Sequence, residues 1–385
     1  MYTHLRKAIL TAAILMAATT TLFAGKPLKV FILAGQSNME GHAAVRTFEH
    51  IGMDPKTAPM LKTMTDTTGK PIVCKDVYIT YLTGKLESPL EKKGKLTAGF
   101  GAQGREPKIG PEFTFGIYMQ QHLNEPFLII KTAWGGKSLY GDFRPPSAGS
   151  FEQAKRPEDT GEYYRAMSKY VNKVLADPGK YHPRYNKGDG HQVAGFVWFQ
   201  GWNDMVNGGV YPNRYNKGGY DEYSKALACF IRDVRKDFKA PRMPFVIGVM
   251  GAGGPTKLYR SPRYKGVHQY FRDAMAAPAS MPEFKGTVAA VLTENYWDAQ
   301  LAELAEERWG KVKAKMKEAE KTGKLGRDEK VALQEKIVAE LYTPEELKIM
   351  QVGKSNAGFH YLGSGKVMSQ IGKGFADAMW ALQGK

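Results

Sequence analysis

Cysteine is scarce in this chain: the 385 residues contain only Cys74 and Cys229. Two cysteines this far apart cannot form the disulfide framework of a small secreted domain, and neither has the spacing of a structural metal site. A single disulfide is permitted in an oxidising compartment. We expect two unpaired thiols and no bound metal.

Long apolar runs are absent after the first 24 residues. Arg6 and Lys7 precede an apolar run from Ala8 to Ala18, which polar threonines end. This pattern is typical of a secretory signal peptide over residues 1–24, with cleavage after Ala24. No later segment is apolar enough to cross a bilayer. The sequence therefore predicts a secreted or periplasmic protein without a membrane span.

Acidic residues are fewer than basic ones, and the formal net charge is +17. Such a surface favours anionic partners, for example acidic or sulfated polysaccharides. The lysines and arginines are scattered singly, and no basic run interleaved with aromatic residues marks a nucleic-acid module. We interpret the charge first as a solubilising surface, and second as attraction to an anionic polymer. The sequence leaves the oligomeric state open.

Five short runs rich in β-branched and aromatic residues predict buried parallel strands. They are Lys29–Leu33, Phe127–Lys131, Gly195–Phe199, Phe245–Met250 and Thr287–Leu292. Amphipathic patterns predict helices over Glu112–His122, Glu162–Ala176, Asp221–Asp237, His268–Met275 and Lys366–Ala381. This alternation indicates one three-layer α/β/α domain over residues 25–385, with a central parallel five-stranded sheet and ligands at the carboxyl ends of its strands.

Two regions exceed a minimal domain of this kind. Residues 42–110 are rich in Gly, Pro, Lys and Thr, and we expect a long excursion there. Residues 299–347 are rich in Ala, Glu, Lys and Leu, and Gly323 and Gly326 mark a break. This second pattern predicts an inserted helical hairpin whose charges form a solvated face.

The strongest chemical signal is the segment Gly35-Gln36-Ser37-Asn38-Met39-Glu40-Gly41, directly after the first predicted strand. A serine on a tight strand-to-helix turn exposes its hydroxyl at the edge of the sheet, and backbone N–H groups at the helix start can face an oxyanion. Because position 39 is Met, the segment does not match the G-x-S-x-G turn of α/β-hydrolases. A serine acting as a helix N-cap is the alternative.

Three further segments lie after strands or before the last helix. Gly135 and Gly136 follow the second strand, Asn203 follows the third, and His360 precedes the closing helix. Each has a plain alternative interpretation, as a flexible turn, a turn-forming Asn or a surface His. Together they supply what acyl transfer needs, which is a nucleophile, a base and donors to the oxyanion.

In that order, Ser37, Gly136, Asn203 and His360 resemble the four marker residues of the SGNH hydrolases. The Gly-Gln-Ser-Asn-Met, Trp-Gly-Gly and Gln-Gly-x-Asn-Asp blocks resemble more specifically the sialate O-acetylesterase-like group, which includes carbohydrate esterase family six. Characterised members deacetylate sialic acids or xylan.

The resemblance implies a flavodoxin-like fold and ester hydrolysis without a metal or cofactor. It makes Ser37 the nucleophile and His360 the base, with Gly136 and Asn203 in the oxyanion hole; Gly135 could supply the N–H instead of Gly136. The motif residues Gln36, Trp134, Gln200 and Trp202 are expected to contact the substrate.

The sequence departs from the family pattern at two positions. Such enzymes usually carry an Asp three residues before the catalytic His, and here position 357 is Ala. The group that orients His360 could be the neutral Asn356, or Glu294 or Asp298 after the fifth predicted strand. Trp202 stands where related proteins often have Glu, and it could stack on a sugar or pack in the core.

The leading interpretation is an esterase that removes O-acetyl groups from sialic acid or from acetylated plant or algal polysaccharides. The missing Asp motivates a first alternative, a sugar-binding protein on the same scaffold that has lost catalysis. An esterase for other acyl groups is the second alternative, and a nucleic-acid role is the third.

Overall fold

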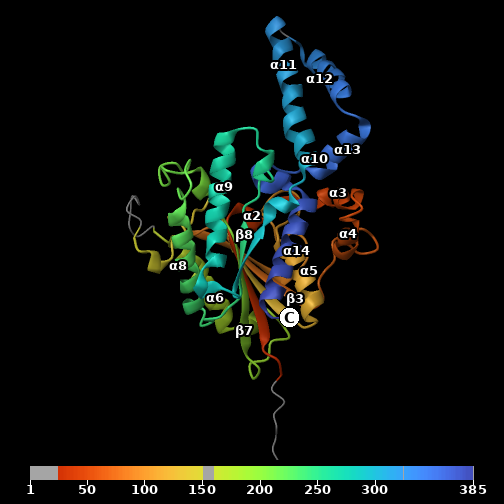
Figure 1. Cartoon of the computed structure of the whole chain (residues 1–385). Coiled ribbons are helices and arrows are strands. Elements are labelled where there is room, and N and C mark those ends of the chain that lie inside the picture. The colour runs from red at the N-terminus through yellow and green to blue at the C-terminus, as the bar shows by residue number, and fades with distance from the viewer. Residues whose placement is uncertain (1–24, 151–159, 324, 385) are drawn as a thin grey trace, which may run out of the picture.

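The computed structural model describes residues 25–150, 160–323 and 325–384 (Figure 1). The predicted signal peptide, residues 1–24, lies outside these ranges. A seven-stranded sheet in the order β4-β3-β6-β1-β7-β8-β9 forms the centre of the molecule. Every neighbouring pair is parallel except β3 and β4. The predicted three-layer α/β class is therefore confirmed.

The strands bury apolar runs from both sides of the sheet, as expected for parallel strands covered by helices. Their bounds are β1 Leu28–Gly35, β3 Val77–Lys85, β4 Ser88–Lys95, β6 Phe127–Ala133, β7 His191–Phe199, β8 Phe245–Val249 and β9 Val288–Leu292. A separate two-stranded sheet pairs β2 Ala43–Ala44 with β5 Lys108–Ile109. All five predicted strands are present, within a few residues of their predicted ends.

The predicted count of five strands was wrong, because the excursion over residues 42–110 contributes β3 and β4 to the sheet. The two strands form an antiparallel hairpin in which Lys85 pairs with Ser88. The edge strand β4 has the sequence SPLEKKGK, and almost all of its residues are exposed. Charged side chains and proline protect an edge strand from pairing with other chains, and they also remove the apolar pattern that would identify it.

Helices cover both faces of the sheet. The longer ones are α5 Glu112–Leu123, α6 Glu162–Ala176, α8 Asp221–Asp237, α9 Pro262–Ala276 and α14 Gly365–Leu382, and the short ones are α2 Ser37–Glu40, α3 Phe48–Met53, α4 Ala58–Met64 and α7 Trp202–Val206. Helices α5 and α14 lie on one face, and α6, α8 and α9 lie on the other (Figure 1).

Aromatic contacts on strand β7 show how the layers are joined. Phe199 packs against Phe375 of α14, with ring centroids 5.3 Å apart. Phe196, three residues earlier, points to the opposite face and packs against Phe230 of α8 at 5.8 Å. Alternate residues of a strand face opposite sides, so this one strand anchors both helical layers.

Residues 299–353 form a helical extension with its own small core. It comprises α10 Ala299–Ala302, a π-helical turn over Glu303–Arg308, α11 Trp309–Thr322, α12 Arg327–Leu341 and α13 Pro344–Gly353. Helices α11 and α12 project from the body of the molecule (Figure 1). Leu301, Leu304, Ile337 and Leu362 belong to a hydrophobic cluster that is separate from the main core.

Both cysteines are free thiols, as the sequence led us to expect. Cys74 is buried, and its burial raises the pKa of the thiol to about 12. Among the helices of the described ranges, we find none with the length and apolar character needed to span a bilayer.

Candidate active site

Four of the predicted site residues line one cavity at the carboxyl ends of the central strands. The cavity has a volume of about 350 Å³ and is bordered by Ser37, Gly136, Asn203 and His360. The loops that follow β1, β6 and β7 contribute the first three residues, and these strands are neighbours in the order β6-β1-β7. His360 comes from a short 3₁₀ segment, Gly358–Gly363, just before α14. We call this space the Ser37 cavity.

Ser37 begins α2, where the chain leaves β1. The turn requires glycine at position 35, because a Cβ atom there would lie 2.1 Å from the carbonyl oxygen of Phe199 on the adjacent strand. Ser37 itself is only 8% exposed. Ser37 therefore borders the cavity as a largely buried residue, at the N-terminus of the short helix.

The segment that carries Ser37 and the segment that carries His360 are joined by a direct hydrogen bond. Asn38 Nδ2 donates to the backbone oxygen of Phe359, at 3.1 Å. These residues flank Ser37 and His360, and 321 positions separate them in sequence. The bond therefore fixes the two segments relative to each other.

Asn356 contacts the ring of His360 and determines its tautomer. The backbone N–H of Ala357 donates to Asn356 Oδ1 at 2.8 Å, which identifies that atom as the amide oxygen. His360 Nδ1 lies 2.9 Å from the same oxygen. Because an amide oxygen only accepts hydrogen bonds, Nδ1 must carry the proton. The other ring nitrogen, Nε2, is then unprotonated in the neutral ring, as a general base requires.

His42 forms a second contact with this pair. Its ring stacks on that of His360, with centroids 3.9 Å apart and planes 3° apart. Its Nδ1 lies 3.5 Å from Asn356 Nδ2, the amide nitrogen. Burial, followed by the charges of neighbouring groups, lowers the pKa of His42 to about 3. His42 is thus a neutral ring at physiological pH, packed against His360.

Burial also lowers the pKa of His360, to about 4, and the positive charge of Lys108 lowers it further in the same direction. A histidine with this pKa stays unprotonated in mildly acidic as well as neutral solution. The ring is consequently able to accept a proton over that whole range.

Gln36 orients the amide of Asn203. The backbone N–H of Gly201 donates to Gln36 Oε1 at 2.9 Å, which fixes the orientation of the Gln36 amide. Gln36 Nε2 then donates to Asn203 Oδ1 at 3.0 Å. The oxygen of Asn203 is occupied by this bond, and its Nδ2 group remains as a donor beside Ser37. Gln36 borders the cavity, but its amide is bonded to protein groups.

The Gly135-Gly136 turn lies against the carboxylate of Glu40. A Cβ atom on Gly135 would lie 3.0 Å from Glu40 Oε2, and the Gly135 N–H bonds to this carboxylate. Thr83 donates its hydroxyl to Glu40 Oε1 at 3.0 Å. Gly136 has a φ of +73°, a conformation that favours glycine, and no atom occupies the position of its missing Cβ within 4 Å. Of the two glycines, Gly136 therefore has the available N–H.

Asp204 is a buried residue for which the sequence predicted no role. Its carboxylate accepts hydrogen bonds from the N–H groups of Leu139 and Tyr140, at 2.8 and 3.1 Å, and from Gln200 Nε2, at 2.6 Å. Burial raises the pKa of Asp204 to about 6. The carboxylate ties the loop after Gly136 to helix α7, which carries Asn203. In the sequence, the only indication of this role is that an Asp directly follows Asn203.

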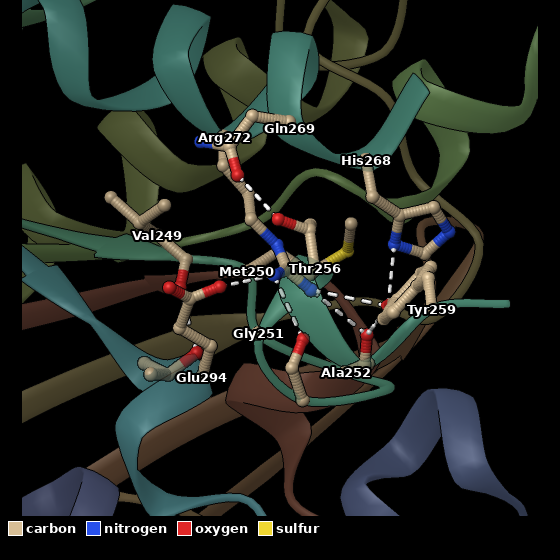
Figure 2. Close-up of polar contacts among 12 residues, drawn as sticks. Val249, Met250, Gly251, Ala252, Thr256, Tyr259, His268, Gln269, Arg272 and Glu294 are labelled. Atoms are coloured by element: carbon tan, nitrogen blue, oxygen red, sulfur yellow. Dashed lines mark hydrogen bonds and ion pairs between the residues drawn. The ribbon is translucent and has the colours of Figure 1, made fainter. Parts of the chain in front are cut away.

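The two carboxylates proposed as alternatives to Asn356 have other partners. Glu294 forms an ion pair with Arg272, which also donates to the backbone oxygen of Ala252 (Figure 2). Arg272 donates to the backbone oxygen of Gly254 as well. Asp298 caps α10 by accepting from Leu301 N and lies 3.1 Å from Lys366. The structure brings Asn356 to His360, and holds these two carboxylates in separate networks.

The residues predicted to contact substrate divide into two groups. Trp202 borders the Ser37 cavity, and its ring lies 5.8 Å from that of Phe359. Trp134 is 3% exposed and packs in the core against Phe143 and Tyr163. Gln200 is 2% exposed and donates to Asp204 and to the backbone oxygen of Lys137. Only the first of these three residues faces the cavity.

A family model described as carbohydrate esterase, sialic acid-specific acetylesterase matches residues 27–282. This match spans well over half of the chain. The chain belongs to this family. It is therefore a carboxylic ester hydrolase of the carbohydrate esterase class. In this esterase, Ser37, Gly136 and Asn203 fall within the matched range, whereas His360 lies beyond its end.

Two solved structures resemble the esterase. A protein from Arabidopsis thaliana has 16% identity and a TM-score of 0.39, with 69% of this chain and 86% of that one covered. A carbohydrate acetylesterase from Xanthomonas citri has 13% identity and a TM-score of 0.39. That comparison covers 68% of this chain and 49% of the other. A search of curated proteins gives no match.

Proposed function

We propose that this esterase hydrolyses O-acetyl esters of carbohydrates through an acetyl-serine intermediate on Ser37. The observation that carries the proposal is the arrangement around the Ser37 cavity. One space of about 350 Å³ holds a serine at a helix start, the neutral His360 and the Asn203 amide. No step in this chemistry needs a metal or an organic cofactor.

In the first half of the reaction, Ser37 Oγ attacks the acetyl carbonyl carbon while His360 Nε2 accepts the hydroxyl proton. The tetrahedral oxyanion accepts hydrogen bonds from the N–H groups of Ser37 and Gly136 and from Asn203 Nδ2. One such donor is worth roughly 3–4 kcal/mol of transition-state stabilisation. When the intermediate collapses, the bond to the sugar oxygen breaks, and His360 returns its proton to that oxygen. The deacetylated sugar leaves.

In the second half, a water molecule attacks the acetyl group on Ser37, and His360 Nε2 takes a proton from the water. The same donors stabilise the second oxyanion. Collapse breaks the bond to Ser37 Oγ, which receives the proton from His360, and acetic acid is released. The acid then ionises to acetate by giving its remaining proton to the surrounding water. The enzyme returns to its initial state, and every proton is accounted for.

Asn356 takes the place of the missing Asp in this proposal. Its oxygen, 2.9 Å from His360 Nδ1, holds the ring in the tautomer that the mechanism needs. A neutral amide stabilises the imidazolium less than a carboxylate does. We therefore assign Asn356 as a positioning residue.

The surroundings of the Ser37 cavity favour a sugar carrying a short acyl group. Trp202 and the exposed ring of Phe359 border it, and such amphipathic faces suit a pyranose ring. Acetylated sialic acid and acetylated plant or algal polysaccharides are the candidate substrates. We propose that residues 25–385 form one exported esterase domain with an inserted helical hairpin over 299–347, and that residues 1–24 are its signal peptide.

The test is acetate release by the purified protein from an aryl acetate, acetylated sialic acid, acetylated xylan and acetylated pectin. Ser37→Ala and His360→Ala are expected to lower turnover by about a thousandfold or more. Ser88→Ala on the exposed edge strand and His191→Ala at an exposed position are the matched controls. Acetate release that survives Ser37→Ala would contradict the assignment.

The alternative of a sugar-binding protein without catalysis rests on Ala357. It predicts binding of a sugar with no release of acetate from any of these esters. An esterase for longer acyl groups predicts faster hydrolysis of aryl butyrate than of aryl acetate. We expect the opposite preference.

A further inference from the structure

Two further cavities lie next to the Ser37 cavity, and Trp202 borders all three. One, of about 310 Å³, is bordered by Trp202, Trp297, Phe359 and His268. The other, of about 260 Å³, is bordered by Trp202, His268, Arg214, Tyr215, Arg263 and Tyr264. We call the last one the arginine cavity. A ligand that extends past Trp202 from Ser37 can therefore reach two arginines.

Arg214 and Arg263 converge on one neutral group. Both donate to the hydroxyl oxygen of Tyr215, Arg214 at a distance of 2.9 Å. Both guanidinium groups also lie over the Tyr215 ring, 5.0 and 4.5 Å from its centroid. Within the described residues, neither arginine forms an ion pair with a carboxylate. Arg214 Nη1 donates to the backbone oxygen of Val206 at 2.6 Å, and its Nε is buried without a hydrogen-bond partner. Arg263 is exposed, so its guanidinium group is the more accessible of the two.

Several other arginines of the molecule have a carboxylate partner. Arg232, Arg260 and Arg308, for example, each pair with a glutamate. Two positive charges that share a phenol oxygen repel each other, and a guanidinium group binds carboxylates and sulfates through paired N–H donors. Hydrogen bonds from Arg263 and Arg214 lower the pKa of the Tyr215 hydroxyl, and the positive charges of the two arginines act in the same direction. An oxyanion would relieve that repulsion.

The remaining walls of the arginine cavity suit a sugar ring. Tyr215 and Tyr264 are 41% and 61% exposed, so their rings are accessible to a ligand. His268 closes the cavity toward Trp202 and lies 3.0 Å from the hydroxyl of Tyr259, which Arg272 contacts in turn (Figure 2). Burial and the charge of Arg272 lower the pKa of His268 to about 4. His268 is therefore neutral, and the positive charge of this cavity comes from Arg214 and Arg263.

We propose that Arg214 and Arg263 form a subsite for an anionic group, a carboxylate or a sulfate, on the carbohydrate whose acetyl ester is cleaved at Ser37. The subsite makes acidic sugars the preferred substrates. This inference rests on the proposed function, because it assumes that Ser37 cleaves a carbohydrate acetyl ester.

The test compares two matched pairs of substrates by acetate release. The first pair is O-acetylated N-acetylneuraminic acid and its neutral carboxamide; the second is acetylated galactose 6-sulfate and acetylated galactose. We expect the wild-type kcat/KM to be about tenfold higher for the anionic member of at least one pair. The pair that shows the preference identifies carboxylate or sulfate as the group bound.

Arg263→Gln is expected to remove this preference through a tenfold rise in KM for the anionic substrate, with kcat unchanged within twofold. Arg263→Lys should retain part of the preference. Lys265→Gln is the control, because it removes the same charge from an exposed position of α9 outside the cavity. Its KM should stay at the wild-type value.

Equal kcat/KM for both members of both pairs would overturn the subsite, as would equal effects of Arg263→Gln and Lys265→Gln. Hydrolysis of an aryl acetate, measured in parallel, separates this failure from failure of the proposed function. An enzyme that cleaves the aryl acetate in a Ser37-dependent way but ignores the anionic group refutes the subsite alone. An enzyme that cleaves no acetyl ester refutes both proposals.

Discussion

The imidazole ring of His42 lies parallel to that of His360, with 3.9 Å between the ring centroids. Asn356 lies beside both rings, its oxygen toward His360 and its nitrogen toward His42. In the usual serine hydrolase triad a carboxylate orients the base. Here the base is held by an amide and by a neutral ring, and neither brings a negative charge. This difference leads to specific expectations for kinetics and pH dependence.

Replacing Asn356 should affect catalysis through the histidine. Asn356→Ala removes the acceptor at His360 Nδ1, and we expect kcat/KM for an aryl acetate to fall about 10- to 100-fold as the required tautomer is lost. Asn356→Asp restores the acceptor with a negative charge, which favours the imidazolium and raises the pKa of His360. The acid limb of its pH profile should therefore move to higher pH. A profile for Asn356→Asp that overlies the wild type would show that Asn356 does not act through His360.

The pH profile of the wild type should extend to low pH. Protonated His360 cannot accept a proton from Ser37, so activity falls only as the pH approaches the lowered pKa of His360, about 4. Lys108 contributes to the lowering, and Lys108→Met should move the acid limb upward. The exposed Lys95 provides the control variant, Lys95→Met. A wild-type acid limb near pH 6.5 would contradict this account of the site.

Substitutions of His42 should distinguish the contribution of its flat ring from the contribution of its ring nitrogens. His42→Phe keeps a flat ring against His360, and we expect kcat to stay within about threefold of the wild type. His42→Ala removes the stacked contact. Because aromatic pairs contribute roughly 0.5–1.5 kcal/mol of interaction energy, we expect kcat to fall about 2- to 10-fold. The measurement is kcat for an aryl acetate at pH 7. Equal losses of kcat in His42→Phe and His42→Ala would indicate that the nitrogens of His42, and not its ring, matter.

Two glycines should respond differently to alanine. In Gly35→Ala the new Cβ meets the Phe199 oxygen at 2.1 Å, so the backbone of β1 or β7 must move. We expect a loss of at least about 3 kcal/mol in the free energy of unfolding. In Gly136→Ala the new Cβ has open space around it. The loss in the free energy of unfolding then comes only from the left-handed backbone conformation, and we expect about 1–2 kcal/mol. Chemical denaturation of both variants measures the difference. Equal losses would contradict the packing described for Gly35.

The positions of Ser37, Gly136, Asn203 and His360 could be predicted from the sequence, because each lies next to a strand or helix with a clear local pattern. The five predicted strands are short runs of apolar residues, which makes them visible in the sequence even though β9 lies at the edge of the sheet. Strand β4 could not be identified in this way, since its exposed lysines and glutamate resemble a loop. Its partner β3 has the sequence VYITYLTGK, a run of β-branched and aromatic residues that could have been identified as a strand.

Side-chain orientation within the motifs could not be predicted. The sequence places Gln36 and Gln200 next to site residues, but the N–H of Gly201 and the carboxylate of Asp204 turn their amides toward the protein. Gly201 and Asp204 follow a different strand from Gln36, and which amide each of them meets depends on how the loops pack. The choice among Asn356, Glu294 and Asp298 likewise depended on Arg272 and Lys366, which pair with the two carboxylates.

The hydrogen bond between Asn38 and Phe359 joins segments that the ribosome makes at opposite ends of the chain. The first strand and its serine emerge early, whereas the segment that carries His360 follows more than 300 residues later. Domains tend to fold as they are synthesised, but here the catalytic constellation cannot form until almost the whole chain is available. Fragments released by premature termination would contain the nucleophile without its base. Such fragments are expected to be inert toward the acetyl esters of the cell that makes them.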